Sequence, residues 1–177
     1  MKQVCSTVIS EGGYELRGLQ QAVSIPITTP VTFTSTNTYH PIISIRLKTN
    51  PERLDAVIIP TAISVLGKGN GINYNWQVRA SGITSGGAWS SVGDDSSVEY
   101  NITGTSFSNG RILASGFLNA SNQASPNIDI LKEALFKFQL ERNSFTNTAY
   151  EITLVAATDT VNGSGMLASM DWEEISR

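Results

Sequence analysis

The chain has 177 residues, which suits one domain with a core of its own, so we expect a single domain over residues 1–177. Only 15% of the residues are charged, the net charge is −3, and the polar residues are dominated by Ser, Thr, Asn and Gly, which favour strands and tight turns. The twelve Lys and Arg are scattered singly, with Arg46, Lys48 and Arg53 nearest to a cluster. A groove that follows phosphates needs a basic stripe, so we expect no nucleic-acid partner.

Cysteine content and hydrophobic runs bear on the compartment. Cys5 is the only cysteine, so no intrachain disulfide can form, and we expect folding in a reducing cytoplasm. The first residues, MKQVCSTVISEGGYE, lack the apolar core of a signal peptide. No apolar run reaches the length of a membrane span, so we expect a soluble protein without a membrane partner.

The N-terminal part predicts a hairpin followed by an extended segment. Two short alternating runs within residues 4–19 flank a pair of glycines, which is typical of a hairpin turn. The next segment contains Pro26 and Pro30, which have no amide hydrogen to donate to a sheet. Residues 23–36, or 20–38 at the widest, are therefore predicted as an edge strand or as an arm. Such an arm would lie either on a neighbouring subunit or on the chain's own surface.

Residues 40–66 predict the two strands around which the rest of the chain is arranged. Ile43, Ile45 and Leu47 alternate with polar residues, as in a strand with one buried face. After a polar loop, residues 56–66 are apolar at odd and even positions, as in a strand covered on both sides. We expect these two strands to pair as a hairpin at the centre of a two-layer β structure.

The next segment predicts a turn, a strand and a loop. Asn70-Gly71 favours the positive φ angles of a type I′ turn. Residues 72–78 then alternate without exception between large apolar and polar side chains, which makes this the clearest strand of the sequence. Residues 80–97 are rich in Gly and Ser and predict a loop that carries one aromatic residue, Trp89.

Two more strands and a mixed segment follow. Residues 98–102 and 111–117 alternate as strands, with Asn109-Gly110 as the turn before the second. Residues 127–142 show helical spacing first and strict alternation afterwards, so we expect a helical turn that runs into a strand.

The chain closes with a predicted second hairpin between residues 150–158 and 166–174, with Met166, Met170 and Trp172 on one face. This makes about nine to ten strands, without the strand–helix–strand rhythm of a parallel sheet. The predicted fold is all-β, a single-domain β-sandwich of jelly-roll or Greek-key type with at most one short helix.

Few residues suggest chemistry. His40 is the only histidine, and no G-x-S-x-G elbow accompanies it, so we expect no catalytic triad and no catalytic residue. One His and one Cys exclude a zinc site with the usual ligands. Asp94, Asp95 and Glu99 lack the spacing of an EF-hand, and we interpret them as part of a solvated loop. We therefore expect neither metal nor cofactor.

The tryptophans and the C-terminal acids have simple structural interpretations. Trp76 and Trp172 fall on the apolar faces of their strands, which predicts core positions. Trp89 is the one candidate for an exposed ligand contact. Glu173 and Glu174 point to opposite faces of a strand and cannot act on one bond, so we interpret them as its polar end.

Three segments resemble a family of tailed-bacteriophage structural proteins that are rich in β-strands. They are VISEGGYELRG, then HPIISIRLK with the following IIP strand, and EITLVAAT with GSGMLASMDWEE. The resemblance implies a virion component that folds in the host cytoplasm, either a capsid decoration (cement) protein or a tail or fibre module, assembled as a trimer. It implies no catalytic residue.

The leading hypothesis is therefore a non-enzymatic, homotrimeric capsid decoration protein whose partners are its own copies and the major capsid protein or other virion proteins. The alternative is a tail-fibre or host-recognition module that binds a bacterial surface glycan through Trp89. An esterase or glycoside hydrolase is not expected, because no competent set of catalytic groups can be assembled. The residues predicted at the subunit contact are Pro26, Pro30, Ile42, Ile58 and Leu66.

Overall fold

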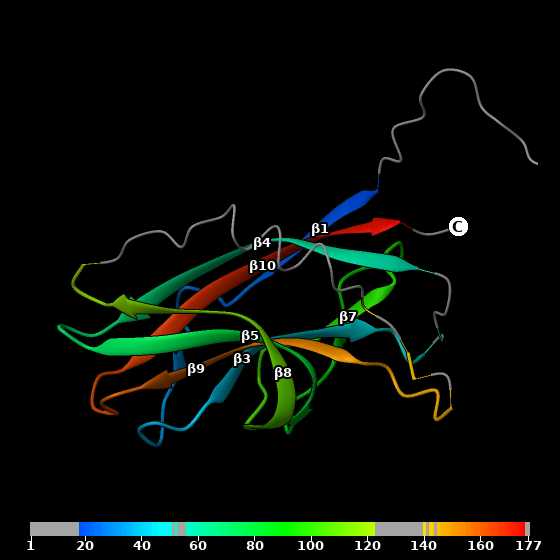
Figure 1. Ribbon diagram of the computed structural model, residues 1–177. Helices are drawn as coiled ribbons and strands as arrows, with labels where there is room; N and C mark the ends of the chain where they lie inside the picture. Colours follow the sequence, from blue (N-terminus) through cyan, green and yellow to red (C-terminus); the bar gives the residue numbers. More distant parts are fainter. Residues whose placement is uncertain are drawn as a thin grey trace, which may run out of the picture.

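The computed structural model describes residues 18–50, 52, 56–122, 140, 142–143 and 145–175. Within them the protein is all-β, with ten strands and no helix. Two antiparallel sheets pack against each other, which confirms the predicted β-sandwich (Figure 1). The strands are β1 (Leu19–Ser24), β2 (Val31–Thr32), β3 (His40–Leu47), β4 (Val57–Lys68), β5 (Asn73–Ser85), β6 (Ser90–Ser91), β7 (Val98–Asn101), β8 (Ser106–Asn119), β9 (Glu151–Thr158) and β10 (Gly165–Ile175).

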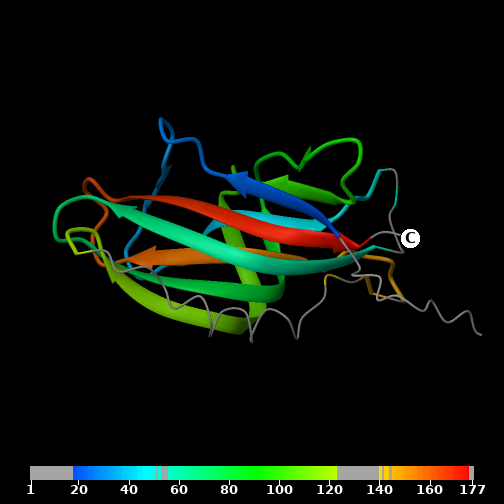
Figure 2. The same cartoon turned by 90° about the horizontal axis from the view of Figure 1, so that it is seen from above.

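The smaller sheet is built on β10. β1 and β2 pair with β10 along one edge, and β4 pairs with it along the other, so that β10 lies between β1 and β4 (Figure 2). The larger sheet has six strands in the order β6-β7-β3-β9-β5-β8. No helix of the described residues is long and apolar enough to cross a membrane.

Both predicted long hairpins are wrong. β3 pairs with β7 and β9 in the six-stranded sheet, whereas β4 pairs with β10 in the other sheet. In the same way β9 and β10 lie in different sheets, so the link between them crosses the sandwich. The physical reason is that alternation tells which face of a strand is buried but not which strand lies beside it. Both arrangements place the same apolar faces in the core.

The link between β4 and β5 also crosses between the sheets. Gly69 and Gly71 have positive φ angles of 97° and 70°, but Asn70 does not. A type I′ turn needs positive φ at both central residues, so the turn predicted at Asn70-Gly71 is not of that type. Ile72, directly after it, is buried at the end of the core.

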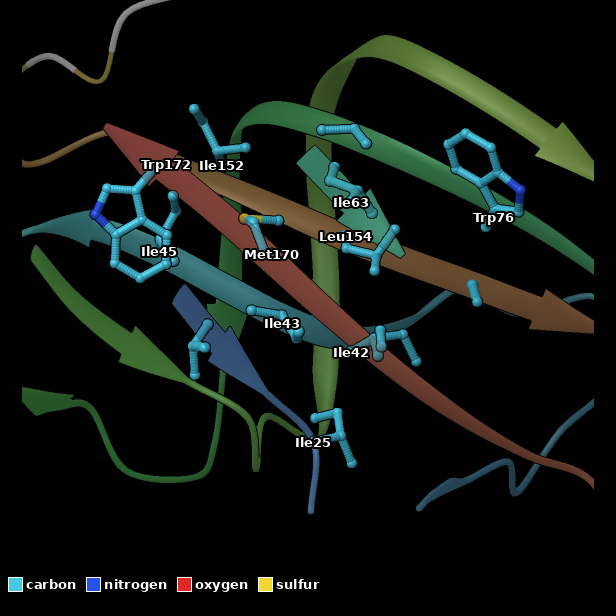
Figure 3. Close-up of a cluster of buried hydrophobic side chains, with 14 of the residues drawn as sticks. Ile25, Ile42, Ile43, Ile45, Ile63, Trp76, Ile152, Leu154, Met170 and Trp172 are labelled. Atoms are coloured by element: carbon cyan, nitrogen blue, oxygen red, sulfur yellow. The ribbon is translucent and has the colours of Figure 1, made fainter. Parts of the chain in front are cut away.

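The core fills the space between the two sheets (Figure 3). Strand β9 is buried along its whole length because it is central in its sheet and covered on both faces. Towards the end of strand β4 only one face is covered, and Leu66 on the other face is 46% exposed. The prediction that both faces of this strand are covered is therefore wrong there. The predicted inward residues are confirmed, and the core includes Ile43, Ile45, Leu47, Trp76, Val78, Ile152, Leu154, Met166, Met170 and Trp172.

Strands β5 and β8 are longer than predicted because they bend together. β5 continues through the predicted loop to Ser85, and β8 runs through the predicted turn at Asn109-Gly110. Ser81, Asn109 and Gly110 have φ angles of 61°, 60° and 86° and lie at the same level of the strand pair. These left-handed residues bend both strands instead of ending them, and the bend of β8 is visible in Figure 1.

The bend places a corner of the sheet, residues 82–87 with 103–110, over the outer face of β3 and β9. Thr84 Oγ1 lies 2.7 Å from Ser44 Oγ of β3 and 3.3 Å from Thr153 Oγ1 of β9. The three hydroxyls are buried, and each has a partner in the other two. The corner therefore explains why the outer face of β9 is buried.

Within residues 20–38, for which an arm or an edge strand was predicted, β1 and β2 form one edge of the smaller sheet among the described residues. Pro26 and Pro30 lie in the link between these two strands, where no sheet hydrogen bond is lost. The hairpin predicted in residues 4–19 lies outside the described residues except at its end, and so does nearly all of the segment 127–142.

Candidate functional site

Two of the predicted contact residues lie in the core. Ile42 and Ile58 are 0% exposed, so the prediction that they contribute to a subunit contact is wrong. The register between β3 and β9 shifts between Pro41 and Ile43, and this bulge turns Ile42 into the core (Figure 3). Ile58 lies opposite Glu174, whose side chain is also buried. Simple alternation does not reveal either position.

Of the other three predicted contact residues, Pro26 and Leu66 are exposed and Pro30 is half-buried. Leu66 is 46% exposed and faces Leu167 of β10 as its cross-strand partner. Ile27, in the link between β1 and β2, is 78% exposed. This link lies at the same end of β10, because Ile25 N donates to Ala168 O at 2.9 Å and β2 pairs with residues 165 and 166. We call the set Pro26, Ile27, Pro30, Leu66 and Leu167 the apolar end.

Trp89 is not a free aromatic ring. The guanidinium of Arg46 lies over it, with Cζ 3.9 Å from the ring centroid, and Trp89 is half-buried. Arg46 is fixed in turn because its Nε donates to Glu99 Oε1 at 2.6 Å. A ligand could stack only on the other face of the ring, which weakens the case for Trp89 as the contact.

Glu99 and His40 make local contacts, whereas Asp94 and Asp95 are exposed. Glu99 binds Arg46 and also accepts a hydrogen bond from Thr49 Oγ1 at 3.2 Å. Among the residues that the structure describes, no group of three His, Cys, Asp or Glu could hold a metal ion. His40 packs edge-on against Phe33, and its Nε2 lies 3.4 Å from Ser35 Oγ. Burial lowers the pKa of His40.

Glu174 is buried, so its interpretation as the polar end of a strand is wrong. Its carboxylate accepts hydrogen bonds from Ser96 Oγ at 2.5 Å, Ser97 N at 2.6 Å and Trp172 Nε1 at 2.8 Å. Trp172 and Glu174 are two residues apart and therefore share the inner face of β10. Glu173, on the other face, accepts a hydrogen bond from Gly18 N at 2.8 Å.

A hollow of about 310 Å³ lies on the outer face of the six-stranded sheet, where β5, β8 and β9 run side by side. No residue in the predicted site set belongs to it. Four segments far apart in the sequence meet there: the approach to β3, the start of β5, the end of β8 and the end of β9. The residues that line the hollow are Asn37, Tyr39, Asn73, Tyr74, Asn75, Phe117, Ala157, Thr158 and Asp159.

A chain of hydrogen bonds fixes the floor of the hollow. Tyr39 OH donates to Asn75 Oδ1 and accepts from Gln77 Nε2, the latter at 2.7 Å. Arg79 Nε donates to Gln77 Oε1 at 2.8 Å, and the Arg79 guanidinium lies over the Tyr39 ring at 4.6 Å. Asn75 Nδ2 donates to Gly116 O at 3.2 Å. The polar groups of the floor are therefore held in one arrangement.

The rim combines one carboxylate with one exposed aromatic ring. Asp159 accepts from Asn73 through Nδ2 at 2.6 Å and through the backbone N at 3.2 Å. Phe117, the cross-strand partner of Asn75, is 84% exposed. Beneath them, burial raises the pKa of Tyr74, with the hydrogen bond from Gly165 N opposing it and the charge of Asp159 adding to it.

Sequence reasoning missed this hollow because its residues read as ordinary strand surface. Asn75, together with Gln77 and Arg79 that support it from outside the lining, was interpreted only as part of the polar face of a strand, and Phe117 only as the end of another. One signal was available: three consecutive outward positions of one strand carry two amides and a guanidinium, side chains that can form hydrogen bonds with one another.

No protein-family model, no curated protein and no solved structure matches this chain. The structure itself defines the class of protein, which is an all-β sandwich of two antiparallel sheets. The likeness to tailed-phage virion proteins rests on the sequence segments alone and stays a proposal.

Proposed function

We propose that this chain is a structural component of a tailed-phage particle that works through protein–protein contacts and not through catalysis. The form we propose is a homotrimeric decoration protein on the capsid. The three sequence segments that resemble phage structural proteins support it. The observation that carries it is the apolar end, where Ile27 is 78% exposed and Leu66 is 46% exposed beside Leu167.

The apolar end is suited to a contact between copies. Two prolines flank Ile27 and limit the freedom of its link, so little conformational entropy is lost when a partner covers it. Covering Ile27 and Leu66 would each contribute about 1 to 2 kcal/mol through the area removed from water. In a closed trimer one patch on each copy meets a different patch on the next copy, and an interface of about 1,600 Å² repeated over a shell resists the pressure of packaged DNA.

The oligomeric state tests this proposal. We expect a trimer in analytical ultracentrifugation, and we expect Ile27→Asp and Leu66→Asp to shift it towards monomer because each buries a charge in the contact. Ile83→Asp is the matched control, since Ile83 is 55% exposed on the corner of the other sheet. A wild-type monomer at high micromolar concentration, or a trimer indifferent to both substitutions, would contradict the proposal.

The position in the particle needs a second measurement. Cosedimentation of the purified protein with phage heads that lack it would support a decoration role, as would a gene beside the major capsid gene. A gene among tail genes would favour the alternative, a tail-fibre or host-recognition module.

A further inference from the structure

We propose that the hollow beside Phe117 is a binding site for a neutral saccharide, with Phe117 as the stacking ring and Asp159 as a hydroxyl acceptor. This inference goes beyond the proposed structural function. It concerns a different surface from Trp89, the contact that the sequence suggested.

The chemistry of the lining matches that of a sugar ring. A pyranose presents an apolar C–H face and a rim of hydroxyl groups, so its site needs an aromatic surface beside amides and carboxylates. Phe117 supplies the surface, since this residue lines the hollow and is 84% exposed. Asp159 and Asn37 supply polar groups within the same lining. Each oxygen of Asp159 accepts one hydrogen bond from Asn73 and has capacity for another.

The floor is organised before a ligand arrives. Tyr39, Asn75 and Gln77 bind one another through their side chains, and Arg79 fixes Gln77 from the far side. Asn73 is held by Asp159 and by Asn119 Nδ2, which donates to its Oδ1 at 2.8 Å. Binding therefore costs little side-chain ordering, which is the main advantage of a preorganised site.

The charge of the lining and the volume of the hollow limit which ligands can bind. Asp159 is the only charged residue of the lining, so an anionic ligand would be repelled, whereas a neutral hydroxyl can donate a charge-assisted hydrogen bond to it. The volume of about 310 Å³ is at the small end of the range of ligand sites, which suits about one or two sugar rings. These features together favour a neutral mono- or disaccharide unit of a larger glycan.

The hollow and the apolar end are on different sheets. The hollow lies on the outer face of β5, β8 and β9, whereas the apolar end belongs to β4, β10 and the β1–β2 link. Failure of one proposal is therefore distinguishable from failure of the other. A monomer that binds sugar would overturn the trimer alone, and a trimer without sugar binding would overturn the saccharide site alone.

Saturation-transfer NMR on the full chain tests the site, with the methyl glycosides of glucose, galactose, mannose, N-acetylglucosamine and rhamnose as probes. An array of neutral bacterial polysaccharides extends the panel. We expect at least one probe or polysaccharide to bind. We expect Phe117→Ala to abolish the signal and Asp159→Asn to weaken binding about tenfold, because a charge-assisted hydrogen bond is lost.

Phe145→Ala is the matched control, since Phe145 is 97% exposed in a turn outside the hollow, and it should leave binding unchanged. Both phenylalanines are at the surface, so neither substitution threatens the fold. Absence of binding across the glycosides and the array would overturn the proposal. So would binding that survives Phe117→Ala, including a signal that instead disappears in Trp89→Ala.

Discussion

Two carboxylates are buried among the residues that the structure describes, and they differ in what surrounds them. Glu174 is 3% exposed and accepts three hydrogen bonds from three different residues. Two of the donors belong to the segment before β7, and the third is Trp172 on the same strand. The carboxylate thus ties the loop before β7 in one sheet to β10 in the other.

Removing this carboxylate should destabilise the protein strongly. Glu174→Ala leaves Ser97 N and Trp172 Nε1 without an acceptor, and we expect a loss of about 3 kcal/mol in the free energy of unfolding. Urea denaturation followed by tryptophan fluorescence measures it. Glu173→Ala is the neighbouring control, because Glu173 is only half-buried and its one donor among the described residues is Gly18 N, so its loss should be about 1 kcal/mol or less. Equal losses in the two variants would contradict this account.

Glu151 is the second buried acid, and it lies under the corner. Burial raises the pKa of this carboxyl, opposed by the hydrogen bonds from Thr84 and by the charge of Arg46. Thr84 N donates to Glu151 Oε2 at 2.8 Å. The folded protein therefore holds the proton of Glu151 more tightly than the unfolded chain does.

This difference gives a pH dependence of known sign. Between the ordinary value of 4.5 and the raised pKa, the folded state binds more protons, so stability is present at lower pH and is lost as the pH rises through this window. Across this pH window we expect the Glu151→Gln variant to lose less stability than the wild type. Thermal unfolding at a series of pH values measures the difference. Burial also raises the pKa of Asp171 and lowers the pKa of His40. These two groups contribute equally to the wild type and to the variant, so their effects cancel in the comparison. Curves of stability against pH that run parallel in the wild type and in Glu151→Gln would contradict the prediction.

At the scale of the element, the bend of β5 and β8 is the decisive feature. Each strand is too long to remain flat over one face of the sandwich, and the left-handed residues at the same level let both turn together. The bend stacks Thr84 against Ser44 and Thr153 and closes the outer face of β9.

Gly110 is the position where the bend is most easily tested. Its φ is +86°, and a Cβ there would lie 3.2 Å from both Cα and N of Gly82. We expect Gly110→Ala to cost about 1–3 kcal/mol of stability in urea unfolding, because strain and crowding add. Gly93→Ala should be neutral, since nothing lies within 4 Å of the added Cβ and the φ is not left-handed. Gly71→Ala, with φ +70° and open space, measures the strain alone.

At the scale of the whole molecule, the two sheets carry separate surfaces. The smaller sheet ends in the apolar end, and the larger sheet carries the hollow. A particle protein with this division would use one sheet to bind its copies and leave the other turned to solvent. Substitutions on one surface should therefore leave the other intact.

Part of the candidate site could be predicted from the sequence. Pro26, Pro30 and Leu66 were predicted at a subunit contact, and that contact stays a prediction; Pro26 and Leu66 are exposed and Pro30 is half-buried, as expected where proline and the end of an apolar run signal an edge. Ile42 was misplaced because a bulge reverses the direction of a side chain, and no residue type marks this bulge. The hollow could not be predicted, because its lining brings together residues as far apart in the sequence as Asn37 and Asp159.

The sequence by itself determined the class of fold and the inward face of most strands, since alternation is a local property that follows from the geometry of an extended chain. Only the tertiary structure decided which strands pair. β3 and β4, like β9 and β10, bury the same faces whether they lie in one sheet or in two, so the pattern does not distinguish the arrangements. Packing of the whole core makes that choice, and with it the positions of the apolar end and the hollow.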